Sequence, residues 1–140
     1  MTHALALLLL AAAAPATACP GLEVVDPWIA EAPPGASVLA GYATLHNAGK
    51  SALTLTGASG GEFESAMLHE TIVSDGMAHM AHLEGLAVPP GADVRLNPGG
   101  KHLMLVGPKR PLKAGDRVKL QLECGDAGRE VTFTVRKDAR

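Results

Sequence analysis

Turn-forming residues recur along this chain at short intervals, and this spacing limits what the chain can fold into. Gly adopts positive φ, Pro presets φ, and Asn or Asp bond to their own backbone, so clusters of these residues form turns. A turn about every 8 to 15 residues is typical of many short β-strands. The clusters are Pro33-Pro34-Gly35, Asn47-Ala48-Gly49, Ser59-Gly60-Gly61, Ser74-Asp75-Gly76, Pro89-Pro90-Gly91, Asn97-Pro98-Gly99-Gly100, Gly107-Pro108, Lys113-Ala114-Gly115-Asp116 and Gly125-Asp126-Ala127-Gly128.

Between the turns, apolar and polar residues alternate. Val118, Leu120 and Leu122 are separated by polar residues, and Phe133 and Val135 repeat the pattern. A period of two indicates half-buried strands. We therefore predict an all-β fold, an antiparallel β-sandwich or a small barrel. The expected strands are residues 22–31, 39–47, 52–58, 62–72, 77–84, 93–96, 101–106, 117–123 and 130–136.

The first 18 residues are typical of a secretory signal peptide. An apolar run from Ala4 to Ala14 precedes a small-residue cleavage pattern that ends at Ala18. The run is too short to span a bilayer, and we expect no transmembrane segment after it. Residues 19–140 suffice for one domain with a real core and are too few for two ordinary ones. We predict a single exported domain.

The charge pattern excludes nucleic-acid binding. The net charge is −2, and the 12 Lys and Arg residues are scattered along the chain. A nucleic-acid interface needs a basic face with stacking aromatic side chains. Trp28, Tyr42, Phe63 and Phe133 are widely separated, so neither requirement is met.

The chain has two cysteines, Cys19 and Cys124, and both follow the expected cleavage site. An even cysteine count in an exported domain favours a disulfide between them. The alternative is a lipid-modified Cys19, which would be the first residue of the mature chain. Lipoprotein signals usually have Leu three residues before that cysteine, whereas this chain has Ala16.

Four side chains are candidate ligands for a soft metal ion: His69, Met80, His102 and Met104. Thioether sulfur suits Cu(I) and is a poor donor for Zn, Mg or Ca, while imidazole serves several transition metals. A single Met or His in a strand is more often a packing or solvated residue. Four such residues indicate copper only if they lie in pairs on shared strand faces.

The first pair falls on a predicted hairpin, because Ser74-Asp75-Gly76 separates two expected strands. A four-residue loop places His69 opposite Met80, and a two-residue loop places it opposite His82. In both registers Met67 shares the face of these residues, since strand side chains alternate between faces. The hairpin alone can therefore present two ligands.

The second pair falls on one strand. His102 and Met104 are two residues apart and share a face, which turns Leu103 and Leu105 toward the core. The preceding Pro98-Gly99-Gly100 lets the backbone approach without side-chain bulk. A metal ion can be held between this strand and the hairpin.

The spacing of the four ligands is part of a set of motifs that extends over nearly all of the mature chain. Together these motifs resemble the periplasmic copper chaperones called PCuAC. They are Asp26-Pro27-Trp28-Ile29, Ala32-Pro33-Pro34-Gly35, Gly41-Tyr42-Ala43-Thr44-Leu45-His46-Asn47, Met67-Leu68-His69-Glu70, Gly76-Met77-Ala78-His79-Met80, Pro98-Gly99-Gly100-Lys101-His102-Leu103-Met104-Leu105 and Leu112-Lys113-Ala114-Gly115-Asp116.

The resemblance implies a cupredoxin-like Greek-key β-sandwich that binds Cu(I) through His69, Met80, His102 and Met104. It also implies a monomer that delivers copper to cytochrome c oxidase assembly, with an oxidase subunit or a Sco-type thiol protein as partner. Some family members carry a His- and Met-rich C-terminal tail. This chain ends in Val135-Arg136-Lys137-Asp138-Ala139-Arg140, so we expect no second site there.

The remaining soft residues divide by position. Met67 and His82 share the expected ligand face and are candidates for auxiliary ligands or supporting groups. His79 and Met77 point to the other face, and His46 adjoins a turn, so we expect structural roles for these three.

Three other functions compete with copper transport as explanations of these residues. A blue-copper electron carrier needs a Cys thiolate beside two His and a Met, and Cys124 lies outside the ligand cluster. An enzyme is not expected, because no acid–base constellation accompanies the ligands. An exported adhesion or assembly module, with incidental His and Met residues, is the remaining alternative.

Overall fold

The computed structural model describes residues 19–137, so the predicted signal peptide lies outside the described residues. All regular structure in this part of the chain is β, which confirms the all-β prediction. Residues 19–137 contain no helix that could span a membrane. The strands are β1 (Leu22–Ala30), β2 (Val38–Asn47), β3 (Leu53–Leu55), β4 (Gly57–Ser59), β5 (Phe63–Ser74), β6 (Met77–Leu83), β7 (Leu86–Val88), β8 (Asp93–Leu96), β9 (Lys101–Pro108), β10 (Arg117–Cys124) and β11 (Ala127–Arg136).

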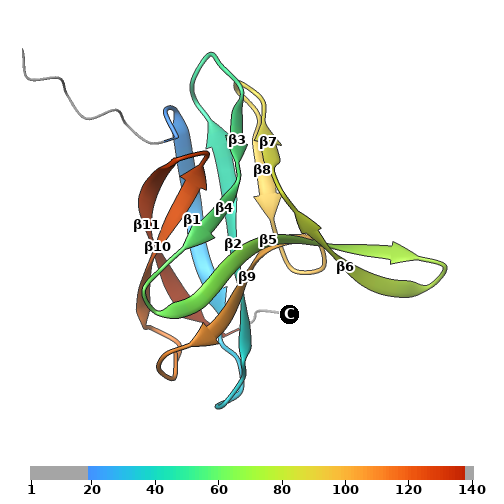
Figure 1. The fold of residues 1–140 in the computed structure, drawn as a ribbon, viewed down its shortest axis with the longest axis vertical. Helices are drawn as coiled ribbons and strands as arrows, with labels where there is room; N and C mark the ends of the chain where they lie inside the picture. Colours follow the sequence, from blue (N-terminus) through green and yellow to red (C-terminus); the bar gives the residue numbers. More distant parts are fainter. Residues whose placement is uncertain (1–18, 138–140) are drawn as a thin grey trace, which may run out of the picture.

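Seven of the strands form a closed barrel in the order β1-β11-β10-β4-β5-β9-β2 (Figure 1). The barrel closes because β1 pairs with β11 on one side and with β2 on the other. Two further strands extend the sheet, β8 beside β2 and β6 beside β5. The short strands β3 and β7 form a separate pair.

This closure differs from the expected two-sheet sandwich. It matches the small barrel, which is the other fold that the sequence pattern predicts. A sandwich leaves sheet edges unpaired, whereas β1 has a hydrogen-bonded neighbour on each side. The pairing of β1 with β11 is also parallel, while the other pairings described are antiparallel, as predicted. Two parallel strands cannot be joined by a tight turn and need a long connection between them. The chain from β1 to β11 provides that connection, because these are the first and last strands.

The barrel interior is filled by the alternating apolar residues. Val118, Leu120, Leu122, Phe133 and Val135 are all buried, as the pattern predicts. Each fully buried side chain of this size stabilises the fold by about 1.5–3 kcal/mol. The alternation therefore fixes which faces of β10 and β11 point inward.

The expected strand at residues 52–58 is instead two short strands, and β7 was not predicted. The chain changes partner at Thr56, whose backbone N–H donates to the carbonyl oxygen of Glu123 at 2.7 Å. Before that residue β3 pairs with β7, and after it β4 pairs with β10. Three-residue strands are too short to show an alternating pattern in the sequence.

Cys19 and Cys124 form a disulfide, which confirms the predicted pairing. Their Cα atoms are 5.5 Å apart and 105 residues apart in sequence. The bond joins the start of the described chain to the end of β10. A sulfur atom in this disulfide is unavailable for a thioether bond to lipid, so the structure favours the first of the two interpretations of Cys19.

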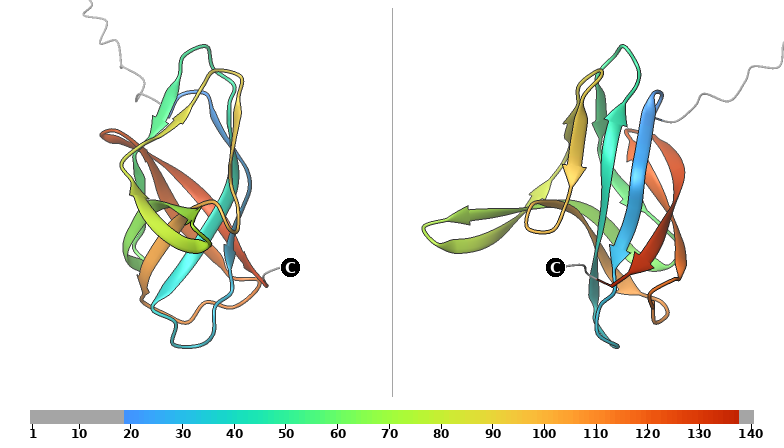
Figure 2. Two further views of the ribbon diagram at one scale, coloured as in Figure 1. Left: turned by 90° about the vertical axis from the view of Figure 1, so that its right-hand side faces the viewer. Right: turned by 180° about the vertical axis from the view of Figure 1, so that it is seen from behind.

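The hairpin of β5 and β6 extends away from the barrel as an arm (Figures 1 and 2). We define the arm as residues 71–80, because β5 pairs with β9 only as far as Glu70. Asp75 and Gly76 both have positive φ, 53° and 75°, as a two-residue type I′ turn requires. The turn sets the register that places His69 opposite His82.

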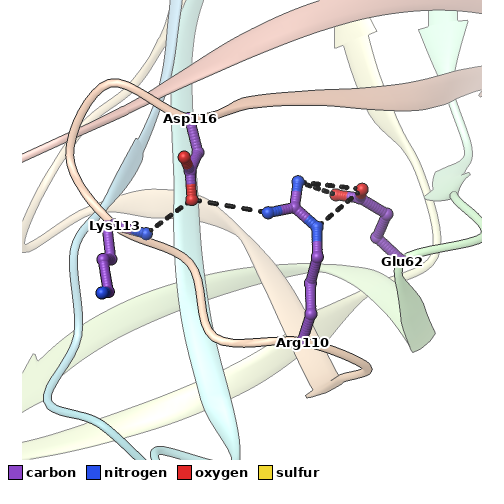
Figure 3. A network of polar contacts seen from close by, with 4 residues as sticks. All are labelled: Glu62, Arg110, Lys113 and Asp116. Atoms are coloured by element: carbon purple, nitrogen blue, oxygen red, sulfur yellow. Dashed lines mark hydrogen bonds and ion pairs between the residues drawn. The ribbon is translucent and has the colours of Figure 1, made fainter.

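A polar network stabilises the barrel beyond the far end of β9 (Figure 3). Arg110 donates hydrogen bonds to Glu62 at 3.0 and 3.1 Å and to Asp116 at 3.4 Å. The backbone N–H of Lys113 donates to the same Asp116 carboxylate at 2.9 Å. The network ties the connection after β9 to the turn before β5.

Candidate metal centre

The predicted ligands lie on the outer face of three neighbouring strands, β6, β5 and β9. Leu68 and Leu103 are fully buried, so alternate residues of β5 and β9 point inward. The residues between them point outward and form one continuous surface, which we call the ligand face. It comprises Met67, His69, Met80, His82, His102 and Met104.

Four of these residues form a square on two barrel strands. On β5 and β9, His69 lies directly opposite His102, and Met67 lies directly opposite Met104. Directly opposed residues have Cβ atoms about 4.5–5.5 Å apart. His69, Met67 and Met104 are half-buried, and His102 is buried. Two imidazoles and two thioethers are thus held together by the backbone of the barrel.

His102 is positioned by its own loop. Only 6% of the residue is exposed, and its Nδ1 lies 3.1 Å from the carbonyl oxygen of Gly100. A carbonyl oxygen can only accept, so Nδ1 carries the hydrogen and donates it. In the neutral ring Nε2 then keeps a free lone pair. Such a hydrogen bond from the far nitrogen is typical of metal-binding histidines.

His69 is the central residue of the ligand face. Its ring centroid is 6.0 Å from that of His102 and 5.5 Å from that of His82. Its Nδ1 is buried and has no hydrogen-bond partner. Burial lowers the pKa of His69 below the ordinary 6.5, and the neighbouring His102 and His82 lower it further. The ring is therefore held in the neutral form, which is the form that binds metal ions.

Met80 is not at the position that the four-residue loop would give it. It lies opposite Thr71 on the arm, and 65% of it is exposed. The structure thus brings His69, His102 and Met104 together and places Met80 further out on the same face. His82 occupies the position opposite His69 instead.

Met67 is the residue whose position the sequence did not resolve. Alternation places it on the ligand face, but its position opposite Met104 depends on the register of β5 against β9. These strands are distant in sequence and have no connecting turn to set that register. His46 lies on β2, where its Nδ1 is 2.6 Å from Asp93 Oδ1, and the structural role that we expect for it stays a prediction.

The donor set differs from that of a zinc or blue-copper site. Both cysteines of the chain are in the disulfide, so no thiolate is available. Within residues 19–137, no group of three or more His, Cys, Asp or Glu is placed to hold a metal ion. Imidazole and thioether together are the donors that this face offers, and that combination suits Cu(I).

Comparison with known proteins places the chain among lipoprotein relatives. Residues 22–136 match the family described as "Putative lipoprotein LpqE-like". The "Putative lipoprotein Lxx21020" of Leifsonia xyli subsp. xyli is 31% identical over 119 residues, which cover 84% of this chain and 70% of that protein.

Solved structures with the same fold are PCuAC domains and a protein of Deinococcus radiodurans. The solution structure of CuI-DR1885 from that organism is 36% identical, with a TM-score of 0.67 over 88% of this chain and 83% of that one. The apo PCuAC domain from PmoF1 is 27% identical, with a TM-score of 0.67 over 86% of this chain and 95% of that one. The chain belongs to the LpqE-like lipoprotein family and has a PCuAC-type fold.

Proposed function

We propose that this protein is a periplasmic copper chaperone that binds Cu(I) through His69, Met80, His102 and Met104. The observation that carries the proposal is the opposed pair of imidazoles, His69 and His102, with the Met104 thioether beside His102 on the same face. His102 uses its Nδ1 for the bond to Gly100, which leaves Nε2 as the nitrogen that can bind a metal ion, and His69 has a buried Nδ1 without a hydrogen-bond partner. Both are suited to a metal ion on the outer side of the barrel.

The comparisons support copper as the ion. DR1885 has been solved in a CuI form, and it is 36% identical to this chain. The four ligands of this chain also match the spacing of the PCuAC signature, which gives the likeness a chemical basis beyond the fold.

The choice of donors fits an exported carrier. Thiolates form disulfides in an oxidising compartment, whereas Met cannot cross-link and needs no deprotonation. Met80 lies on the exposed arm, so one ligand can be exchanged with a partner while three stay on the barrel. We propose that the receiving partner is an oxidase subunit or a Sco-type thiol protein, in the assembly of cytochrome c oxidase.

The proposed location is the periplasm, with the mature chain free of a lipid anchor. The expected signal peptide and the lipoprotein relatives support export. The disulfide at Cys19 supports a chain that is not anchored through that residue.

An anaerobic Cu(I) titration against a coloured copper-binding competitor tests the proposal. The wild-type protein should bind one copper per chain. A Met80→Leu, Met104→Leu double variant should bind at least about 100-fold more weakly, since even groups outside the ligand set cost about 10–100-fold when removed from metal sites. Met77→Leu is the matched control, because Met77 is an exposed methionine on the other face of the arm. Equal copper binding by the double variant and the wild type would instead favour the adhesion or assembly module.

A further inference from the structure

The ligand face holds one more thioether than the proposed site uses. Met67 lies directly opposite Met104 and two residues before His69 on the same strand. We propose that Met67 is an alternative copper ligand that replaces Met80 when Met80 leaves the metal ion. The inference rests on the proposed function, because it concerns the same copper ion.

The barrel holds Met67 close to three of the four proposed copper ligands. It belongs to the part of β5 that pairs with β9, so the barrel fixes its backbone beside His69 and Met104. The side chain is half-buried. Its three rotatable bonds allow the sulfur to turn toward an ion over the square. Met67, His69, His102 and Met104 therefore form a complete set of four soft donors without the arm.

Met80 is held far less firmly. Its strand, β6, pairs only with β5, and residues 71–80 extend beyond the last pair between β5 and β9. Ile72, Val73 and Met77 on the same arm are also exposed. A receiving protein can reach Met80 directly, whereas Met67 lies on the barrel.

The exchange needs no change in oxidation state. As the bond from copper to the Met80 sulfur breaks, a bond to the Met67 sulfur forms, and both donors are neutral. The ion keeps four ligands and the same charge throughout. A ligand of the receiving protein can then approach the ion from the side that Met80 has left and displace one of the barrel ligands as its own bond forms, so the copper is retained until that protein is engaged.

The alternative is that Met67 only packs against Met104 and has no bond to copper. Methionine fills gaps in strands more often than it binds metal. The two roles differ in how the loss of Met67 combines with the loss of Met80. Replacement by Leu removes the sulfur while keeping the volume close to that of Met.

A double-mutant cycle separates these roles. Cu(I) affinity is measured for wild type, Met67→Leu, Met80→Leu and the double variant, with Met77→Leu as control. If either thioether can bind the ion, each single variant should lose about 10-fold or less in Cu(I) affinity. The double variant should lose more than the product of the two single losses, at least about 1,000-fold in affinity. X-ray absorption of the copper-loaded Met80→Leu protein should still show two sulfur neighbours.

Two results would overturn the inference. One is a double variant that binds copper as well as Met80→Leu alone, and the other is a Met80→Leu protein with one sulfur neighbour. Urea unfolding of each variant shows whether a loss of affinity comes from a damaged fold. Failure of the wild-type protein to bind Cu(I) would instead contradict the proposed function itself, so the two failures are distinguishable.

Discussion

His69 on β5 lies directly opposite His102 on β9, and their ring centroids are 6.0 Å apart. The two rings differ in the hydrogen bonding of Nδ1. His102 donates its Nδ1 hydrogen to Gly100, while the buried Nδ1 of His69 has no partner. A metal ion at this place would satisfy a buried nitrogen that otherwise costs free energy.

The lowered pKa of His69 predicts how the apo protein responds to pH. In the unfolded chain this imidazole takes up a proton near 6.5, and in the folded chain it does so at a lower pH. Between these values the unfolded state binds more protons, so the free energy of unfolding should fall as the pH decreases below 6.5. Urea unfolding at several pH values should show a loss of unfolding free energy below pH 6.5 in the wild type, and this loss should be absent in His69→Gln. An NMR titration that puts the His69 midpoint at or above 6.5 would contradict this.

Leu103 should be essential for both stability and copper binding. Its side chain is 0% exposed and lies between His102 and Met104 on β9. Leu103→Ala should lower the free energy of unfolding by about 2–5 kcal/mol, because it leaves a cavity in the core. It should also weaken Cu(I) binding by loosening the strand that positions both ligands.

Val73→Ala is the control for this experiment, since Val73 is 71% exposed on the arm. Its free energy of unfolding should stay within about 0.5 kcal/mol of the wild type. Equal unfolding curves for Leu103→Ala and Val73→Ala would show that the interior of β9 is not packed as described.

The disulfide should contribute strongly to stability. It closes a loop across a sequence separation of 105 residues. A Cys19→Ser, Cys124→Ser double variant should lose about 2–5 kcal/mol of unfolding free energy. Intact mass of the mature exported protein, with and without reductant, gives a second test. A mass that includes lipid on Cys19 would contradict the disulfide and the proposed free chain.

The polar network around Arg110 should affect stability slightly and copper binding not at all. Its ion pairs to Glu62 and Asp116 join partly exposed side chains. Arg110→Ala should cost about 1 kcal/mol or less, as is usual for such pairs. Arg110 lies beyond the end of β9, whereas His102 lies at its start. A clear change in Cu(I) affinity would mean that the network also positions the ligand face.

Local patterns predicted the parts of this structure that depend on neighbours in sequence. Alternation fixed the inward faces of β10 and β11, and the Asp75-Gly76 turn limited the hairpin to two registers. The spacing of His102 and Met104 placed both on one face of β9, opposite Leu103. The even cysteine count predicted the disulfide between Cys19 and Cys124, which the structure contains.

Pairings between distant segments could not be predicted. The parallel contact of β1 with β11 closes the barrel, yet nothing in either strand specifies the other as its partner. The square of Met67, His69, His102 and Met104 likewise depends on the register of β5 against β9. The resemblance to PCuAC implies Met80 as a ligand, whereas alternation alone makes Met67 an auxiliary candidate.

X-ray absorption spectroscopy of the Cu(I)-loaded wild-type protein tests the central claim most directly, because it identifies the atoms bound to copper. A site formed by His69, His102, Met104 and one further methionine predicts two nitrogen and two sulfur neighbours. A copper ion surrounded only by nitrogen and oxygen would contradict the account.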